Sequence, residues 1–131
     1  MDKPFDSKHI QKVGLISKRD LDDKKLVEKL VKYLEKKGKD VLLDQNLAKL
    51  LKRGSGLKKE QLLSKIDMGI SLGGDGTLLK IARRHPRHHV PILGVNMGNL
   101  GFLTETVPDK MFGVLDNIFK NQCRLDRRTI L

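Results

Sequence analysis

The stretch from Ile66 to Ala82 constrains the fold of this chain more than any other part of the sequence. It begins with an alternating pattern that is typical of a strand at least half buried. Three glycines around one aspartate follow, and apolar residues then recur at helical spacing. We therefore predict a strand, a tight turn and a helix. The alternating residues that we expect to point the same way are Ile66, Met68, Ile70 and Leu72.

The turn Gly73-Gly74-Asp75-Gly76 is a candidate phosphate site. Glycine permits positive φ and lets a ligand approach the backbone, and the free N–H groups of the following helix attract anions. A carboxylate is repelled by phosphate, so Asp75 needs another role, such as holding a metal or accepting a proton. The alternative is that Asp75 only caps the helix. Neither the G-x-G-x-x-G pattern nor a Walker lysine is present.

A second glycine-rich loop, Asn96 to Thr104, follows another apolar segment, Val90 to Val95. Within that segment Pro91 fits a strand only near its start. The carboxyl ends of parallel strands meet at one edge of a sheet, where ligands gather. We therefore expect the two loops to lie side by side and to form one cleft.

The remaining pattern alternates strands with helices. Short apolar runs predict buried strands at 13–16 and 41–43. Apolar residues at helical spacing predict a helix over 26–34, which is capped by Asp20 or Asp22 and ends at Gly38. We expect short helices around 47–51 and 62–63. A longer helix is expected from Pro108 to Phe119. This order predicts an α/β fold, a Rossmann-like parallel sheet with helices on both faces. We expect residues 1–131 to form a single α/β domain.

The charge favours anionic partners. Lys and Arg number 27 against 16 acidic residues, a net charge of +11. Lys18 and Arg19 follow the first strand, where they either face a phosphate or are solvated. Four Phe, one Tyr and no Trp offer few platforms for base stacking, so we predict no nucleic-acid partner. No apolar run approaches the ~20 residues that span a bilayer, so we predict no membrane partner.

The N-terminus lacks a signal-peptide core, and the single cysteine, Cys123, fits a reducing compartment. We therefore expect a cytoplasmic protein. His85, His88 and His89 lie on a proline-broken segment among arginines, which repel cations. We favour an exposed basic loop there and predict no metal ligands in the chain.

Two motifs together carry a family resemblance. Gly73-Gly74-Asp75-Gly76-Thr77 resembles the GGDGT signature shared by NAD kinases, diacylglycerol and sphingosine kinases and, more loosely, phosphofructokinases. Asn96-Met97-Gly98-Asn99-Leu100-Gly101-Phe102-Leu103-Thr104 resembles the N-x-G-x-L-G-F-L-T stretch of NAD kinases. The resemblance to NAD kinases extends over nearly the whole chain.

This resemblance implies transfer of a phosphoryl group from ATP, or from polyphosphate in some members, to the 2′-hydroxyl of the adenosine ribose of NAD, which gives NADP. It implies that Asp75 accepts the proton of that hydroxyl. It also implies a divalent metal, Mg²⁺ or another, that is carried with the nucleotide. The residues that it implies beside NAD or the donor phosphates are Gly73, Gly74, Gly76, Thr77, Lys80, Asn96 and Phe102, with Phe102 near the adenine.

NAD kinases continue into a second, β-rich domain that supplies ribose contacts and oligomer contacts, and this chain stops where that domain would begin. We therefore expect a partial enzyme that is inactive by itself, and a homo-oligomer for the longer protein. The alternative function is a GGDGT-type lipid kinase, which acts on diacylglycerol or a sphingoid base. That reading calls for an exposed apolar patch or an interfacial helix, and the sequence offers neither.

Overall fold

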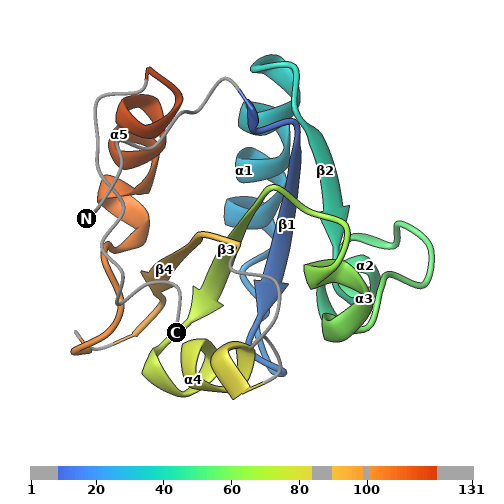
Figure 1. The fold of residues 1–131 in the computed structure, drawn as a ribbon. Coiled ribbons are helices and arrows are strands. Elements are labelled where there is room, and N and C mark those ends of the chain that lie inside the picture. Colours follow the sequence, from blue (N-terminus) through green and yellow to red (C-terminus); the bar gives the residue numbers. More distant parts are fainter. Residues whose placement is uncertain (1–8, 84–89, 99–100, 121–131) are drawn as a thin grey trace.

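The computed structural model describes residues 9–83, 90–98 and 101–120 (Figure 1). Its centre is a four-stranded sheet of parallel strands in the order β2-β1-β3-β4. The strands are β1 (Lys12–Ser17), β2 (Asp40–Leu43), β3 (Met68–Gly73) and β4 (Ile92–Asn96). The chain runs outward from β1 to β2, returns to β3 and continues outward to β4. The strand order therefore reverses between β1 and β3.

Helices cover both faces of this sheet. Residues of α1 (Lys24–Lys36), α2 (Gln45–Leu51) and α5 (Pro108–Phe119) pack into the hydrophobic core of one face. Residues of α3 (Lys59–Leu63) and α4 (Asp75–Arg83) pack into that of the other. This confirms the predicted Rossmann-like α/β fold. In the part of the chain that the structure describes, none of these helices has the length and apolarity needed to cross a bilayer.

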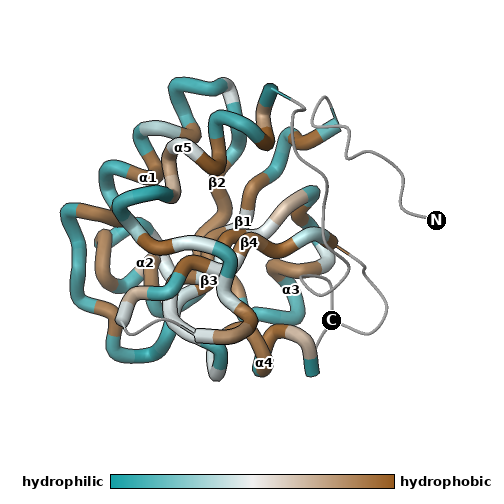
Figure 2. The backbone as a smooth tube through the Cα atoms, turned by 90° about the vertical axis from the view of Figure 1, so that its left-hand side faces the viewer, coloured by the Kyte–Doolittle hydropathy of each residue, from teal (hydrophilic) through white to brown (hydrophobic). Residues whose placement is uncertain are grey.

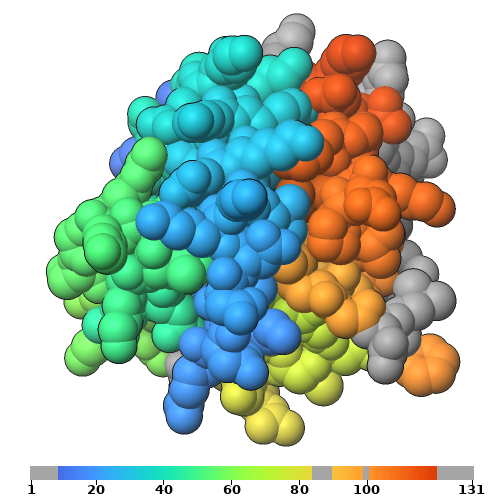
Figure 3. All heavy atoms as spheres, turned by 180° about the vertical axis from the view of Figure 1, so that it is seen from behind, coloured from blue at the N-terminus to red at the C-terminus, as the bar shows by residue number. Residues whose placement is uncertain are grey.

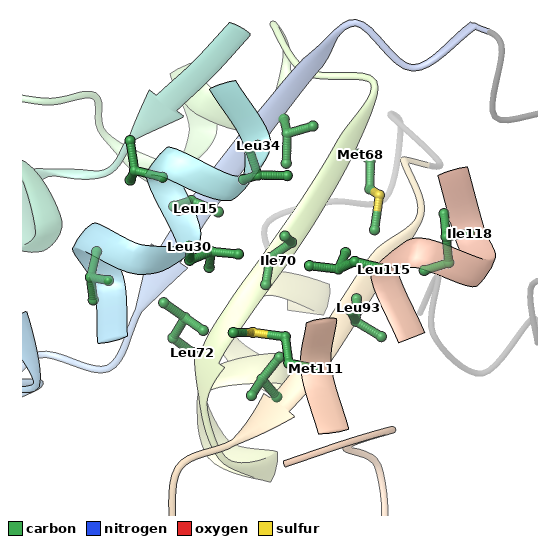
Figure 4. Packing of buried hydrophobic residues seen from close by; sticks show 14 of the residues in the cluster. Leu15, Leu30, Leu34, Met68, Ile70, Leu72, Leu93, Met111, Leu115 and Ile118 are labelled. Carbon is green, nitrogen blue, oxygen red and sulfur yellow. The ribbon is translucent and has the colours of Figure 1, made fainter. Parts of the chain in front are cut away.

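The larger core lies under α1 and α5, and Figure 4 shows its leucine, isoleucine and methionine side chains meeting over the middle of the sheet. The hydropathy colouring of Figure 2 shows the same separation, with apolar strands inside and hydrophilic segments around them. β3 and β4 are buried along their whole length, because both of their faces are covered. This explains the apolar run of β4, whereas β3 fills its second face with glycines and the buried Ser71.

An aromatic contact joins α1 to α5, which lie side by side on the face seen in Figure 3. The Tyr33 ring packs edge-on against Phe112, with 5.2 Å between ring centroids, and stacks on Phe119 at 6.5 Å. Its hydroxyl donates a hydrogen bond to Asp116. Lys37 also approaches that carboxylate, at 3.7 Å. These contacts fix α5 against α1. They also hold the short segment that connects the second motif, Asn96 to Thr104, to the start of α5.

Two local predictions are wrong. Ile66 does not share a side with Met68; it precedes β3 and packs with Leu62 in the core of the opposite face. The cap of α1 is Asp23, whose carboxylate accepts a hydrogen bond from the N–H of Leu26 at 3.2 Å, rather than Asp20 or Asp22. Pattern alone does not fix where a strand or helix begins, since neighbouring residues of the same type compete for that position.

Other local predictions are confirmed. α1 ends before Gly38, which has a φ of +78°, and α5 has Pro108 in its first turn. Pro91 precedes β4 and contributes its carbonyl oxygen to a hydrogen bond from Gly69. The interpretations of the His85–His89 segment and of Cys123 concern residues outside the described ranges.

Candidate active site

The first motif forms the junction between β3 and α4. β3 ends at Gly73 and α4 begins at Asp75, so only Gly74 connects them. None of the three motif glycines has a positive φ. Gly73 instead permits a close approach: a Cβ at this position would lie 2.3 Å from Oγ1 of Thr77 and 3.3 Å from Cβ of Lys18. A Cβ on Gly74 or Gly76 would point into open space.

The second motif lies directly beside the first, as predicted. Gly73 pairs with Asn96 at the ends of β3 and β4, and the N–H of Met97 donates to the Gly73 carbonyl at 2.7 Å. The shared edge of the sheet therefore holds both loops. In Figure 1 this is the end of the sheet near α4.

The Asp75 carboxylate connects the two motifs. It accepts hydrogen bonds from three consecutive backbone N–H groups, those of Phe102 at 2.7 Å, Leu103 at 3.0 Å and Thr104 at 3.3 Å. Gly101 makes this approach possible, since a Cβ there would lie 2.3 Å from Asp75 Oδ1. Asp75 is thus the first residue of α4, and its side chain turns away to hold the second motif. These contacts contradict the alternative that Asp75 only caps its own helix.

These hydrogen bonds keep Asp75 ionised. The N–H groups of Phe102, Leu103 and Thr104 stabilise the charged form and hold the pKa of the Asp75 carboxyl below its ordinary value of 3.8. Oδ1 accepts two of the bonds and Oδ2 only one. A carboxylate has about four acceptor positions. Within the described residues, one acceptor position on Oδ2 therefore stays open to a further donor such as a hydroxyl.

Asn96 and Phe102 differ sharply in their surroundings. Asn96 is buried; its Oδ1 accepts from the N–H of Gly98 at 2.9 Å and its Nδ2 donates to Oγ1 of Thr104 at 3.2 Å. Its side chain therefore shapes the loop. Phe102 is 98 % exposed although its N–H donates to Asp75. Sequence reasoning missed Thr104, which reaches both side chains that organise this loop.

A second feature adjoins α4 on the side of β1. It is a cavity of about 550 Å³, which we call the basic cleft. It contains Thr77 and Lys80, so these two predicted residues face away from the second motif. Sequence reasoning pointed to Lys18 and Arg19 but missed the cations that α3 contributes. The residues that line the basic cleft are Lys18, Arg19, Asp44, Gln45, Asn46, Leu57, Lys58, Lys59, Glu60, Thr77, Lys80 and Arg83.

Asp44 forms part of the wall of the basic cleft. Its buried carboxylate accepts hydrogen bonds from the N–H of Ser17 at 2.9 Å and the N–H of Leu47 at 2.8 Å. Burial raises the pKa of the Asp44 carboxyl, and these two hydrogen bonds act against that rise. Asp44 thus ties the end of β1 to the start of α2, and so positions the segment that carries Lys18.

The donor set at this edge does not make a metal centre. Among residues 9–83, 90–98 and 101–120, no three His, Cys, Asp or Glu side chains lie close enough together to hold an ion. Mg²⁺ prefers carboxylate and other oxygen ligands. Among the described residues at the junction of the two motifs, Asp75 is the one carboxylate, and most of its acceptor positions are already used.

Comparison with known proteins identifies the family. Residues 13–123 match the family model described as the ATP-NAD kinase N-terminal domain. The chain is 39 % identical to the NAD kinase of Hydrogenovibrio crunogenus over 110 residues. This alignment covers 81 % of this chain and 38 % of that protein. It is 34 % identical to the NAD kinase of Sulfurimonas denitrificans over 128 residues, and this alignment covers 97 % of this chain and 45 % of that protein.

The fold has a match among solved structures as well. A crystal structure of yeast NADH kinase in complex with NADH superposes with a TM-score of 0.72 at 19 % identity, over 88 % of this chain and 39 % of that one. At this identity the match concerns the fold. The chain spans less than half the length of the relatives named above. These comparisons do not favour the lipid-kinase alternative, and the match over residues 13–123 shows that the chain belongs to the NAD kinase family.

Proposed function

We propose that this chain is the N-terminal catalytic part of a cytoplasmic NAD kinase. In this proposal the protein transfers a phosphoryl group from ATP or polyphosphate to the 2′-hydroxyl of the adenosine ribose of NAD, which gives NADP. The observation that carries the proposal is the position of Asp75, an ionised carboxylate held between the two motif loops at the carboxyl ends of β3 and β4. Homo-oligomerisation of the longer protein is part of the same proposal.

Asp75 acts on the acceptor hydroxyl. The open acceptor position of Oδ2 takes the hydrogen bond of the 2′-hydroxyl, which orients the oxygen toward the donor. The 2′-oxygen then forms a bond to the terminal phosphorus while the bond from that phosphorus to its bridging oxygen breaks. The hydroxyl proton passes to Asp75, and the shortened donor leaves. General-base assistance of this kind contributes ~10²–10⁴-fold.

The low pKa of Asp75 suits an orienting group better than a strong base. Phosphoryl transfer passes through a loose transition state, so the attacking oxygen needs little prior deprotonation. Positioning and neutralisation of charge do most of the work. A carboxylate fixed by three N–H groups has little freedom to rotate, which favours this role.

The remaining site residues surround this group. We assign the exposed Phe102 to contact with the adenine. The open space above Gly74 and Gly76 lets the phosphates of NAD or of the donor approach the backbone. Gly73 and Asn96 act by shaping the two loops, and Thr77 and Lys80 by contacting phosphates. A divalent ion arrives with the nucleotide, since the described residues do not form a centre for it.

The direct test measures NADP formation from NAD with ATP or polyphosphate as donor. It uses the 131-residue chain beside a longer protein, in which this chain is followed by the C-terminal part of the Hydrogenovibrio crunogenus NAD kinase. We expect weak NAD binding and little turnover from the chain alone, and clear turnover from the longer protein. In the longer protein, Asp75→Asn lowers kcat by ~10²-fold or more, because the neutral amide of asparagine is too weak a base to accept the proton.

The matched control is Glu35→Gln, which removes an exposed carboxylate in the last turn of α1 and keeps kcat unchanged. Full turnover by the Asp75→Asn protein would restrict Asp75 to holding the second motif. An absence of NADP formation in the longer protein, with the fold intact, would contradict the proposed function as a whole.

A further inference from the structure

Thr104 joins the end of the second motif to β4. Its hydroxyl oxygen accepts a hydrogen bond from Nδ2 of Asn96 at 3.2 Å. Its methyl group lies against the same strand: a Cβ added to Gly94 would come within 3.4 Å of Cγ2 of Thr104. A β-branched side chain is also stiff at χ1. Both arms of the Thr104 side chain therefore contact β4, and together they fix the position of its Cβ.

Asn96 is a firm partner for this contact. It is buried, and its own N–H donates to the Thr106 carbonyl at 2.8 Å. Its Oδ1 accepts from the N–H of Gly98 at 2.9 Å, so its Nδ2 is the atom that faces Thr104. An unpaired polar group is costly at a buried position. The Asn96 amide thus holds the Thr104 hydroxyl in one place.

Two sets of donors compete for the Asp75 carboxylate. Asp75 is the first residue of α4, and the first N–H groups of a helix have no partner within it and attract negative charge. The other set consists of the N–H groups of Phe102, Leu103 and Thr104, to which the carboxylate is bound. Only the second arrangement turns the carboxylate toward the second motif. The position of that motif therefore decides where the carboxylate points.

Thr104 belongs to both networks. Its N–H donates to Oδ1 of Asp75 at 3.3 Å, while its hydroxyl accepts from Asn96. On its other side, the N–H of Glu105 donates to the Gly94 carbonyl at 2.8 Å, which holds the peptide unit that follows Thr104. With the Cβ and the carbonyl carbon both held, the tetrahedral Cα fixes where the Thr104 nitrogen lies. The side chain of Thr104 thereby fixes the end of the row of donors that binds Asp75.

We propose that Thr104 is a positioning residue of the active site. Through its bond to Asn96 it holds the three N–H groups where they turn the Asp75 carboxylate away from α4 and toward the acceptor hydroxyl. Thr104 touches no substrate in this role. Its part in phosphoryl transfer rests on the proposed function, whereas its hold on the carboxylate does not. Without the Thr104 hydroxyl, the carboxylate turns back to the first N–H groups of α4.

The first experiment measures the hold on Asp75 without any substrate. Amide hydrogen exchange of Phe102 and Leu103 is followed by NMR in the 131-residue chain, with Asp75→Ala as the reference for loss of the carboxylate. Thr104→Val keeps the methyl arm and removes the hydroxyl, and Thr104→Ser does the reverse. We expect Thr104→Val to speed the exchange of both amides by about tenfold or more, because they lose a charged acceptor. Thr104→Ser should leave it within about twofold.

The matched control is Thr106→Val, the same chemical change two residues further along the chain. The Thr106 hydroxyl donates to the Val107 carbonyl at 3.4 Å, and in the described part of the chain no hydrogen bond joins it to Asp75. This variant should leave the exchange within about twofold, since its hydroxyl lies outside the network. Unchanged exchange in Thr104→Val, or equal acceleration by Thr106→Val, would overturn the proposal.

Circular dichroism shows whether Thr104→Val folds. If it does not, Thr104→Ala takes its place, because the smaller side chain lets water reach the Asn96 amide, and the same acceleration is expected. Faster exchange in Thr104→Ser but not in Thr104→Val would mean that the methyl arm alone holds the motif, and would overturn the proposal.

The second experiment tests in the longer protein whether Thr104 acts through Asp75. Thr104→Val should lower kcat by about tenfold or more with the KM for the donor unchanged, because a misplaced reacting group costs rate. Thr104→Ser should restore kcat. In the Asp75→Asn protein, Thr104→Val should have no further effect on kcat, since residues that act as a unit are not additive. An equal loss in both backgrounds would mean a general structural role and would overturn the proposal.

The proposed function can fail independently. Amide exchange that depends on Thr104, with no NADP formed by the longer protein, would keep the hold on Asp75 and remove the kinase. NADP formation with kcat unchanged in the Thr104→Val protein would keep the kinase and remove Thr104 as its positioning residue.

Discussion

Phe102 combines a fixed backbone with a free side chain. Its N–H is held 2.7 Å from Asp75 Oδ2, while 98 % of the residue is exposed. A large apolar ring in solvent gains nothing for folding, so its removal should cost the fold little. The Asp75 carboxylate fixes the position of the Phe102 backbone, and under the proposed function this limits how far an adenine stacked on Phe102 can lie from Asp75.

We expect Phe102→Ala to raise the KM for NAD by about tenfold and to leave the melting temperature unchanged. Stacking of a base on an aromatic ring contributes about 1–3 kcal/mol, whereas the exposed ring has no buried area to lose. Steady-state kinetics of the longer protein and thermal unfolding check the two halves of this prediction. Phe102→Tyr, which keeps the ring, is the control and should retain the KM. A KM unaffected by the loss of the ring would place the adenine elsewhere.

At the scale of the elements, two glycines differ in the space that surrounds them. Gly14 in β1 lies beneath the segment before β3: an added Cβ would come within 2.8 Å of the Ile66 side chain and 3.2 Å of Leu62. Gly113 lies on the exposed side of α5, where an added Cβ meets nothing within 4 Å. The same substitution therefore has opposite consequences in the two elements.

Gly14→Ala should destabilise the chain by about 1–3 kcal/mol, because the added methyl group overpacks the core beneath α3. Gly113→Ala should stabilise it by about 0.5–1 kcal/mol, because alanine loses less backbone freedom than glycine in a helix interior. Urea unfolding of the two variants beside the unaltered chain measures both changes. A stabilising Gly14→Ala would mean that Ile66 moves aside easily and that this core is loosely packed.

For the whole molecule, the acid stability depends on carboxylates that bind backbone N–H groups. Asp67 Oδ2 accepts from the N–H of Gln11 at 2.9 Å and that of Lys12 at 2.8 Å, which joins the start of β1 to the start of β3. The hydrogen bond from Lys12 is the main cause that holds the pKa of Asp67 below 3.8. A carboxyl whose pKa is lower in the folded state stabilises the fold above its unfolded pKa, and this contribution is lost as the pH falls through the folded value.

Asp67→Asn should therefore reduce the free energy of unfolding at pH 7, and the difference from the unaltered chain should shrink steadily below about pH 4. Urea unfolding at a series of pH values between 7 and 3 gives this difference directly. Asp20→Asn serves as the control, because among the described residues no backbone N–H donates to Asp20, and its effect should not vary with pH in this way. A difference for Asp67→Asn that stays constant down to pH 3 would contradict the linkage.

The sequence by itself determined the order of the elements and the sheet. All four strands lie close to where the sequence predicted them, β1 and β4 from apolar runs that strands covered on both faces require, and β3 from its alternating pattern. β2 was also found from its apolar run, but its residues are only half-buried or exposed, so the prediction of a buried strand there is wrong. The adjacency of the two motifs also followed from sequence, since β3 and β4 are consecutive strands and parallel neighbours end at the same edge. The GGDGT-like turn and the loop from Asn96 identified the family before any contact was known.

Only the tertiary structure decided what the motif residues touch. The Asp75 carboxylate accepts hydrogen bonds from N–H groups 27 to 29 positions away along the chain. The motif glycine Gly73 leaves space for the Thr77 side chain, and its φ is not positive. The basic cleft brings Lys18 and Lys58 to the same cavity, although 40 positions separate them. Periodicity and local motifs report contacts between near neighbours along the chain. The basic cleft depends instead on the crossover that places β3 beside β1, and the Asp75 contacts depend on the path of the loop after β4; no local pattern encodes either.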